Sequence, residues 1–279
     1  LTATGLPTGT YYARTWRFGD YINEAYNDVH DCLGCSVTSW TPITVIAGGT
    51  TTGIDFALTL GSRVSGRITD AATGAPLSGG WVDFYNSAGM WVTNGSPDVS
   101  GNYLTGGGLP PGTYYARSSN FGGYINEAYN DIQCLNCSAT SGTPITVNVG
   151  APTTGIDFAL VLGGEITGTV VDGGTALPLS GVSVRLMTAS GANAVTATTD
   201  GTGRYRLRGL PAGAYYVGTA NSLGYINEFY DDAPCVLTCG STGGTPVTVS
   251  AGAVAGSVNF ALTAGGRISG TITDATTGL

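Results

Sequence analysis

Short runs of alternating apolar and polar residues, separated by clusters of glycine, proline, asparagine and aspartate, extend along the whole chain. In Arg63–Thr69, Val64, Gly66 and Ile68 fall on one side, which is the period-two pattern of a half-buried strand. Similar runs predict further strands at Trp81–Tyr85, Met90–Thr93, Gly112–Arg117, Thr143–Val149 and Gly155–Leu160. A helical period does not persist beyond a turn or two. Six or seven short strands in about 100 residues predict an all-β fold, a β-sandwich.

The strand pattern is itself repeated along the chain. Gly5–Arg14 recurs as Gly108–Arg117 and, more loosely, as Gly209–Tyr216, and residues 5–28 match residues 108–131 at 19 of 24 positions. A period of about 100 residues is longer than a solenoid repeat and corresponds to a small domain. The predicted organisation is 1–60, the C-terminal part of a repeat; 61–162 and 163–264, two complete repeats; and 265–279, the first strand of a following repeat.

The junctions between these segments are short. Leu58–Arg63 and Leu160–Glu165 each lead from the last strand of one repeat to the first strand of the next, without a proline- or serine-rich linker. Flexible linkers need such composition and greater length. A stiff linear array of β-sandwich domains is therefore predicted.

Three motifs give the repeat a family resemblance. A turn of the form T-D-A-x-T-G-x-P-L-x-G, a D-x-x-G-x-Y turn and a G-L-P-x-G-x-Y-Y segment follow one another in that order. The order resembles the carboxypeptidase regulatory-like domain, an Ig-like or prealbumin-like (transthyretin-like) seven-stranded sandwich. The resemblance implies a non-catalytic module of secreted and surface proteins, and the loop with its cysteine pair looks like tandem arrays of bacterial extracellular proteins. The motifs lie at Thr69–Gly79, Asp98–Tyr103 and Gly108–Tyr115, and again at Val171–Gly181, Asp200–Tyr205 and Gly209–Tyr216.

One turn departs from this family pattern. Asp172–Pro178 lacks the threonine–glycine pair that precedes the proline in the other repeat. Since glycine commonly supplies the positive φ of such turns, a different turn is expected there.

Composition narrows the function classes. Charged residues make up 10% of the chain, the formal net charge is −8, and every basic residue is arginine. Nucleic-acid binding requires a basic face, so this class is excluded. No apolar run reaches the length of a membrane helix, and no membrane span is expected in this segment. Without lysine, Lys–Asn isopeptide cross-links cannot form, so stiffness must come from junctions, cores and disulfides.

Each repeat has one close pair of cysteines. Zinc would need two more ligands per repeat, and the single histidine, His30, lies in the first repeat only. A redox C-x-x-C site needs a βαβ unit, which the pattern lacks. The interpretation left is a local disulfide in each repeat, formed in an oxidising, extracellular or cell-surface location. Its stabilising effect should be small because each loop is short. The pairs are Cys32 with Cys35, Cys134 with Cys137, and Cys235 with Cys239.

A Tyr-Ile-Asn-Glu loop precedes every cysteine pair. Three interpretations are open: a polar clasp in which glutamate accepts backbone hydrogen bonds, a contact between domains or subunits, or a Ca²⁺ site. A catalytic carboxylate pair is not indicated, because no cleft is predicted. No metal or other cofactor is expected. The loop residues are Tyr21, Asn23, Glu24 and Tyr26; Tyr124, Asn126, Glu127 and Tyr129; and Tyr225, Asn227, Glu228 and Tyr230.

The two ends of the chain fall out of phase with the repeats. In the last segment Arg267 precedes Ile268, Gly270 and Ile272, which alternate as in the first strand of a repeat. Two explanations are open. The chain is a window of a longer array, or this assembly strand inserts beside residues 1–60 of the next subunit, giving a head-to-tail filament. The second would leave about two strands missing from the composite domain.

These features favour a non-enzymatic structural protein, a subunit of an extracellular filament, fibre or surface stalk. Its partner is then itself, head to tail, or the rest of a longer repeat chain. The alternative is a cell-surface carbohydrate- or protein-binding, adhesin-like module. The four tryptophans (Trp16, Trp40, Trp81 and Trp91) all lie in the first third of the chain, so they do not form a sugar-binding platform repeated in each unit; contacts between domains or subunits are open to them. Asn94 and Asn136 fit the N-glycosylation pattern, so attached glycans are a further hypothesis. A Ser-His-Asp triad cannot occur in repeats without histidine.

Overall fold

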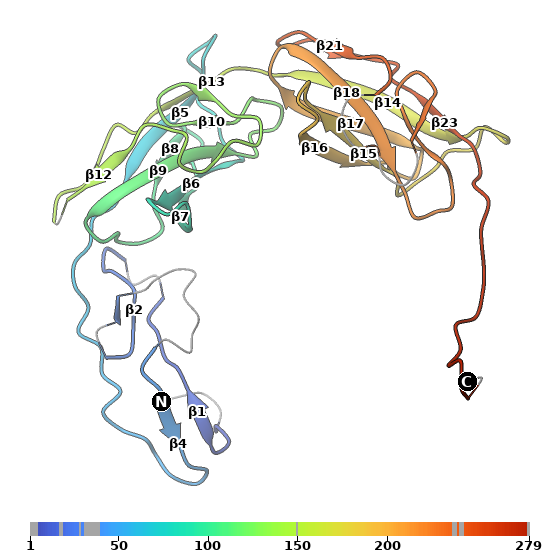
Figure 1. Ribbon diagram of the computed structural model, residues 1–279. Coiled ribbons are helices and arrows are strands. Elements are labelled where there is room, and N and C mark those ends of the chain that lie inside the picture. The colour runs from blue at the N-terminus through green and yellow to red at the C-terminus, as the bar shows by residue number, and fades with distance from the viewer. Residues whose placement is uncertain are drawn as a thin grey trace. The chain divides into compact units, whose positions relative to one another are not determined.

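The computed structural model describes residues 5–16, 19–27, 29–30, 40–148, 150–235, 239 and 243–277. The chain forms two compact units, Leu1–Leu162 and Gly163–Leu279. Figure 1 shows that the described residues form strands and loops only. The all-β prediction is confirmed. Below, residues 1–60, 61–162 and 163–264 are called repeats 1, 2 and 3.

Repeat 2 is a sandwich of two sheets. Its described residues form a six-stranded sheet in the order β11-β10-β9-β6-β7, with β12 also paired to β9, and a three-stranded sheet in the order β13-β5-β8. The first and last strands, β5 and β13, run parallel, and Phe158 pairs with Ile68. The strands are β5 (Ser65–Asp70), β6 (Trp81–Asn86), β7 (Trp91–Gly95), β8 (Asn102–Leu104), β9 (Gly112–Ser119), β10 (Glu127–Ala128), β11 (Ile132–Gln133), β12 (Ile145–Val147) and β13 (Phe158–Leu160).

Repeat 3 has the same arrangement of strands with one addition, β22, where repeat 2 has only the isolated bridge between Val64 and Thr153. Its larger sheet has the order β16-β15-β18-β19-β20 with β21 on β18, and its smaller sheet the order β17-β14-β22 with β23 on β14. Again the first and last strands pair in parallel, with Val170 opposite Phe260. The strands are β14 (Gly164–Asp172), β15 (Ser183–Met187), β16 (Asn193–Thr198), β17 (Arg204–Leu210), β18 (Gly213–Ala220), β19 (Asn227–Phe229), β20 (Ala233–Cys235), β21 (Val247–Val249), β22 (Val254–Ala255) and β23 (Phe260–Leu262).

Repeat 1 forms four short strands among its described residues. β1 (Gly9–Tyr11) pairs with β4 (Ile43–Val45), and β2 (Glu24–Ala25) pairs with β3 (Val29–His30). Residues 56–58, which correspond to β13, take no strand conformation. In repeat 2 this strand depends on its parallel partner β5 for hydrogen bonds, and repeat 1 has no counterpart of β5.

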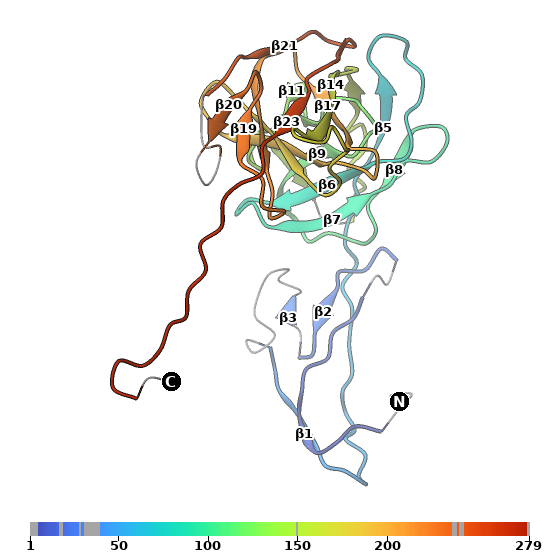
Figure 2. The same ribbon diagram turned by 90° about the vertical axis from the view of Figure 1, so that its right-hand side faces the viewer.

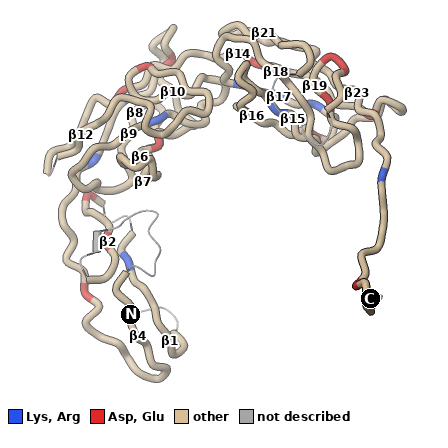
Figure 3. Tube along the Cα trace, viewed as in Figure 1, with Lys and Arg blue, Asp and Glu red and all other residues tan. Residues whose placement is uncertain are grey.

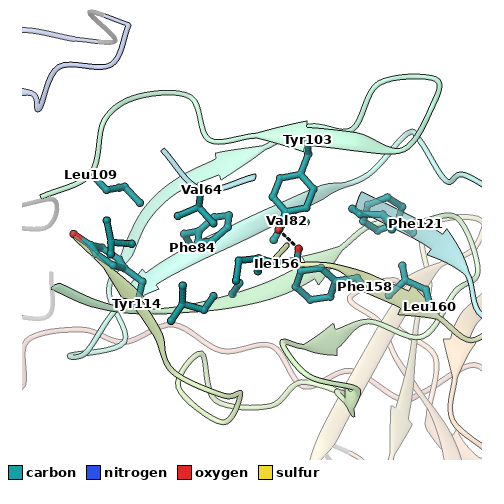
Figure 4. Close-up of a cluster of buried hydrophobic side chains, with 14 residues drawn as sticks. Val64, Val82, Phe84, Tyr103, Leu109, Tyr114, Phe121, Ile156, Phe158 and Leu160 are labelled. Carbon is teal, nitrogen blue, oxygen red and sulfur yellow. Dashed lines mark hydrogen bonds between the residues drawn. The ribbon is translucent and has the colours of Figure 1, made fainter. Parts of the chain in front are cut away.

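The core of repeat 2 lies between its two sheets (Figure 4). Val82 and Phe84 of β6 are fully buried against Ile68 of β5 and Phe158 of β13. Each such side chain contributes roughly 1.5–3 kcal/mol on burial. The Tyr103 hydroxyl in the same cluster donates a hydrogen bond of 2.5 Å to the Ile156 carbonyl. Tyr205 and Val258 form the same bond in repeat 3, so the core keeps its polar atom satisfied in both sandwiches.

A glycine in the first strand of each complete repeat lets the backbone just before the last strand approach it closely. A Cβ on Gly66 would lie 2.0 Å from the Ile156 carbonyl oxygen, and one on Gly168 would lie 1.8 Å from the carbonyl oxygen of Val258. No other residue fits between these backbones. The alternation of Val64, Gly66 and Ile68 therefore places a backbone contact, rather than a third apolar side chain, at the middle position.

The turn that lacks the family's threonine–glycine pair has the same hydrogen bonds as its counterpart. Asp172 Oδ1 accepts hydrogen bonds from the amides of Gly174 and Thr175, as Asp70 Oδ1 does in repeat 2. Gly74 has φ +68°, and Ala176 takes its place at φ +58°. The expectation of a different turn is wrong, because the aspartate bonds and the next strand impose the conformation on alanine.

Residues 265–274 of the second unit extend away from its sandwich and form no strand (Figures 1 and 2). Ile268 and Ile272 are completely exposed, although their counterparts Val64 and Ile68 are fully buried in repeat 2. A strand needs a hydrogen-bonding neighbour, and this segment has none within the described residues. Only the turn after it forms, where Asp274 Oδ1 accepts hydrogen bonds from the amides of Thr276 and Thr277.

Candidate assembly site: the Tyr-Ile-Asn-Glu loop

The loop occupies the same place in all three repeats. It follows the long central strand and pairs with the residue at which the chain passes to the next repeat. Tyr21 bridges Leu60, Tyr124 bridges Leu162, and Tyr225 bridges Ala264. The sequence separates each of these pairs by about 38 residues, so only the sandwich fold brings the loop to the junction.

The tyrosine connects this loop to the aspartate turn after the first strand. The Tyr124 hydroxyl donates to Asp70 Oδ2 at 2.7 Å, and Tyr225 donates to Asp172 Oδ2 at 2.6 Å. These hydrogen bonds hold the pKa of Asp70 and Asp172 below the usual range and raise the pKa of both tyrosines. The Tyr21 side chain is 45% exposed.

The glutamate is buried inside the loop. Glu127 is 3% exposed, its amide donates to Ser118 Oγ at 2.8 Å, and its carboxylate accepts a hydrogen bond from the Ala159 amide of β13. Its Oε1 atom has no hydrogen-bond partner among the described residues. Burial, with a smaller contribution from the nearby charge of Asp131, raises the pKa of Glu127 to about 7.

The other two repeats hold their glutamates similarly. Glu228 accepts from the Ala261 amide, and burial together with Asp232 raises its pKa. Glu24 is 2% exposed, and its amide donates to Thr15 Oγ1 at 3.0 Å. Position 15 and its counterparts, Ser118 and Thr219, all carry a hydroxyl. That shared hydroxyl is the sequence signal for this partner of the glutamate amide.

The remaining loop residues tie it to the core and to the cysteine segment. The carbonyl of Asn126 accepts from the Cys134 amide at 2.7 Å, and the side chain of Asn227 accepts from Asn221 at 2.6 Å. The second tyrosine of each loop packs edge-on against the phenylalanine of the last strand, with ring centroids 6.0–6.4 Å apart. The pairs are Tyr26 with Phe56, Tyr129 with Phe158, and Tyr230 with Phe260.

Two of the cysteine pairs form disulfides. In both Cys134–Cys137 and Cys235–Cys239 the Cα atoms are 5.2 Å apart. The first lies beside Arg117, whose Nη1 donates to the Cys137 carbonyl at 3.4 Å. In repeat 3 glycine, Gly218, takes the place of that arginine, and Cys239 packs into the space. Cys32 and Cys35 lie outside the described residues.

The contact from repeat 1 to repeat 2 is made through this loop. Ile22 bridges Gly108, the Asp20 carbonyl accepts from the Gly61 amide at 2.8 Å, and Arg63 Nε lies 3.1 Å from Asp20 Oδ1. A Cβ on Gly108 would lie 2.1 Å from the Asp20 carbonyl oxygen. Glycine is thus required for the two repeats to approach this closely.

The exposure of the loop isoleucine differs between repeat 1, which a following repeat covers, and repeat 3. Ile22 lies against Gly61 and beside Leu109 of repeat 2 and is 4% exposed, whereas Ile226 is 42% exposed. Arg267, the counterpart of Arg63, also turns back toward the loop before it, and its Nη2 donates to the Leu223 carbonyl at 3.4 Å. The junctions after repeats 1 and 3 therefore both start with an arginine folded against the preceding loop, whereas Glu165 takes this position at the start of repeat 3.

The described surface offers little for ionic chemistry. Charged residues are few and scattered in Figure 3. Within the described residues no group of three or more histidine, cysteine, aspartate or glutamate side chains is placed to hold a metal ion. Over the same residues, no helix has the length and apolar character to cross a membrane. Asn136 is exposed and Asn94 is half-buried on β7.

Comparison with known families identifies one repeat directly. Residues 165–263 match the carboxypeptidase regulatory-like domain. The family prediction is confirmed for this region. In this carboxypeptidase regulatory-like domain, the Asp172 turn, Tyr205 and the Glu228 loop occupy the positions described above. No curated protein matches the chain.

Several solved structures show a distant likeness to this chain. The Bacillus anthracis TIE protein is 16% identical with a TM-score of 0.31, over 92% of this chain and 42% of that one. GBS52, the minor pilin of Streptococcus agalactiae, is 15% identical with a TM-score of 0.34, over 76% and 99%. The shaft pilin SpaA from Lactobacillus rhamnosus GG is 14% identical with a TM-score of 0.30, over 75% and 99%. Scores this low do not establish a shared fold or function. This chain spans less than half of the first of these proteins.

Proposed function

We propose that this chain is a non-catalytic structural subunit of an extracellular fibre or cell-surface stalk, in which β-sandwich repeats are joined head to tail. The following repeat belongs either to the same longer chain or to another copy, and the same junction serves in both cases. The proposal includes an oxidising, extracellular location, which agrees with the two disulfides.

The contrast between Ile22 and Ile226 is the observation that carries the proposal. The two residues occupy equivalent positions, but only Ile22 is covered by a following repeat. In the junction after repeat 1, Ile22 bridges Gly108 of repeat 2, whereas Ile226 has no such cover among the described residues and its side chain stays exposed. The second unit therefore presents the same loop that repeat 1 uses to hold repeat 2.

Electron cryo-microscopy of the native extracellular material tests the proposal. We expect fibres whose axial repeat is a whole number of sandwich domains, with continuous density from the loop of residues 224–228 into the next repeat. Isolated rods without end-to-end contacts at any concentration would overturn it and favour a surface binding module.

A further inference from the structure

Repeat 2 carries a cluster of polar and aromatic side chains on the outer face of its larger sheet. Asp83 on β6 is 8% exposed and accepts three hydrogen bonds. The indole N–H of Trp91 donates to its Oδ1 at 3.0 Å, and Trp81 Nε1 and Ser119 Oγ donate to its Oδ2 at 3.0 and 2.8 Å. A buried carboxylate thereby fixes the Trp91 ring, which is itself 39% exposed.

The sandwich does not need this cluster. Strand register places Ser183, Arg185 and Asn193 of repeat 3 at the positions of Trp81, Asp83 and Trp91. The larger sheets of both repeats nevertheless have the same strand order and pairing. Since the fold forms without the cluster, a fixed and exposed tryptophan in repeat 2 alone indicates a role in binding.

A second exposed tryptophan lies across a groove from Trp91. Trp16 of repeat 1 is 46% exposed, and the Arg14 guanidinium lies 4.3 Å from its ring centroid. Trp16, Ile22 and Asn23 line one side of the groove, and Trp91, Thr93 and the glycines at 106–108 line the other. The bridge between Ile22 and Gly108 and the ion pair between Asp20 and Arg63 fix the two sides relative to each other.

The chemistry of this lining selects one class of ligand. It contains two indole rings, an amide, a hydroxyl, glycine backbone groups and the apolar side chains of Ile22, Val92, Leu109 and Pro110, and none of its side chains is charged. Electron-rich indole faces attract polarised C–H groups, and amide, hydroxyl and backbone groups pair with ligand hydroxyls. The Arg14 guanidinium is stacked on the Trp16 ring and is not among the lining residues, so the lining itself offers no cation to an anionic ligand. We propose that the groove between Trp16 and Trp91 binds a neutral oligosaccharide.

This function goes beyond fibre formation, because the site lies at one junction and is absent from the sequence of the next. The counterparts of Trp16 and Trp91 elsewhere in the chain are Ser119, Ala220 and Asn193. A fibre of such chains would present the groove once per chain rather than once per repeat.

Isothermal titration of the 279-residue chain with chitohexaose, cellohexaose and maltohexaose tests the proposal. We expect at least one of these probes to bind with a Kd below about 1 mM. Trp16→Ala and Trp91→Ala should each weaken that binding at least about tenfold, as loss of a central aromatic contact typically does. Met90→Ala, a neighbouring residue that is 40% exposed and outside the groove, should leave it unchanged.

Three results would overturn the proposal. They are no binding of any neutral hexasaccharide, the same affinity in both tryptophan variants as in the parent chain, or binding of a proline-rich decapeptide more tightly than any of the hexasaccharides. Hyaluronan hexasaccharide, which carries carboxylates, should bind at least about tenfold more weakly, and equal affinity would contradict the selectivity for neutral sugars. If Trp91→Ala lowers the melting temperature, Trp91→Phe keeps a smaller ring and should give intermediate affinity. Fibre assembly should be unaffected by these variants, so the two proposals fail separately.

Discussion

At the scale of single residues, the aspartate of each repeated turn motif holds its turn by accepting backbone hydrogen bonds. Asp70, Asp172 and Asp274 each accept hydrogen bonds from the amides two and three residues later. These bonds are local, so the turn forms at Asp274 even though the strand before it does not. At Ala176 the same bonds hold a non-glycine residue in the left-handed region.

Exchanging alanine and glycine at this turn tests the strain at Ala176. The left-handed conformation costs a non-glycine residue roughly 1–2 kcal/mol, part of which glycine's chain entropy offsets. We expect Ala176→Gly to raise the free energy of unfolding of the second unit by about 0.5–1 kcal/mol. In repeat 2, Gly74→Ala should lower stability by a similar amount. Urea unfolding monitored by circular dichroism measures the free energy of unfolding of both variants. Changes of the same sign in the two variants would contradict the strain at Ala176.

Glu127 predicts a pH dependence of stability. Burial raises its folded pKa from 4.5 to about 7, so the folded chain retains a proton that the unfolded chain releases. Its contribution to stability is complete below about pH 4.5 and is lost as the pH rises to about 7. Glu127→Gln, which cannot ionise, should be more stable than the parent above pH 7 and should flatten the profile.

Melting temperatures between pH 4 and pH 8 measure this effect. Asp131→Asn serves as a second variant, because removing that charge should lower the Glu127 pKa and shift the loss of stability to higher acidity. Parallel profiles for Glu127→Gln and the parent chain would contradict the assignment.

At the scale of elements, the loop, the cysteine segment and the last strand form one connected structure in each complete repeat. The loop glutamate accepts from the last strand, and the second tyrosine packs on that strand's phenylalanine. The disulfides close very short loops and sit in different surroundings: beside Arg117 in repeat 2, and against Met187 and Phe229 in repeat 3.

Removing the two disulfides should therefore have unequal effects. Chain entropy assigns about 2 kcal/mol to a bridge across such a short loop. Cys134→Ala with Cys137→Ala should cost about that amount or less. Cys235→Ala with Cys239→Ala should cost roughly 1 kcal/mol more, because it also removes a packed sulfur from the cluster with Phe229. Calorimetry of the two double variants tests this, and equal costs would show that packing around Cys239 adds nothing.

At the scale of the whole molecule, the junction after repeat 1 shows how one repeat contacts the next. The loop isoleucine, the carbonyl before the loop and an arginine from the following strand make the contact described between repeats 1 and 2. The second unit presents Ile226 and Arg267 in the corresponding positions. Stiffness would then arise from backbone contact at glycine rather than from a linker.

Ile226→Asp should prevent the end-to-end contact without destabilising the unit, because the side chain is already 42% exposed. We expect fibres at least about tenfold shorter by electron microscopy, with an unchanged melting temperature. Leu177→Asp, at a residue that is 64% exposed on the Asp172 turn, introduces the same charge away from the junction and should leave fibre length unaltered. Equal fibre lengths for the two variants would contradict the proposed junction.

The sequence by itself determined the features that depend on local interactions and on periodicity. Alternation placed Val64, Gly66 and Ile68 on one face of a strand, and the aspartate motifs marked the turns, because both properties belong to residues a few positions apart. The repeat arithmetic predicted matching loops, and the cysteine spacing predicted the bonds Cys134–Cys137 and Cys235–Cys239. These features need no knowledge of distant parts of the chain.

Only the tertiary structure decided which distant groups meet. It paired Tyr124 with Asp70, placed the Ala159 amide at Glu127, and brought Trp16 and Trp91 to one groove. It also showed that Ala176 adopts glycine's conformation and that residues 265–274 form no strand in the absence of a pairing neighbour. The physical reason is common to all of these: strand pairing, burial and side-chain contacts depend on partners that sequence separation does not reveal.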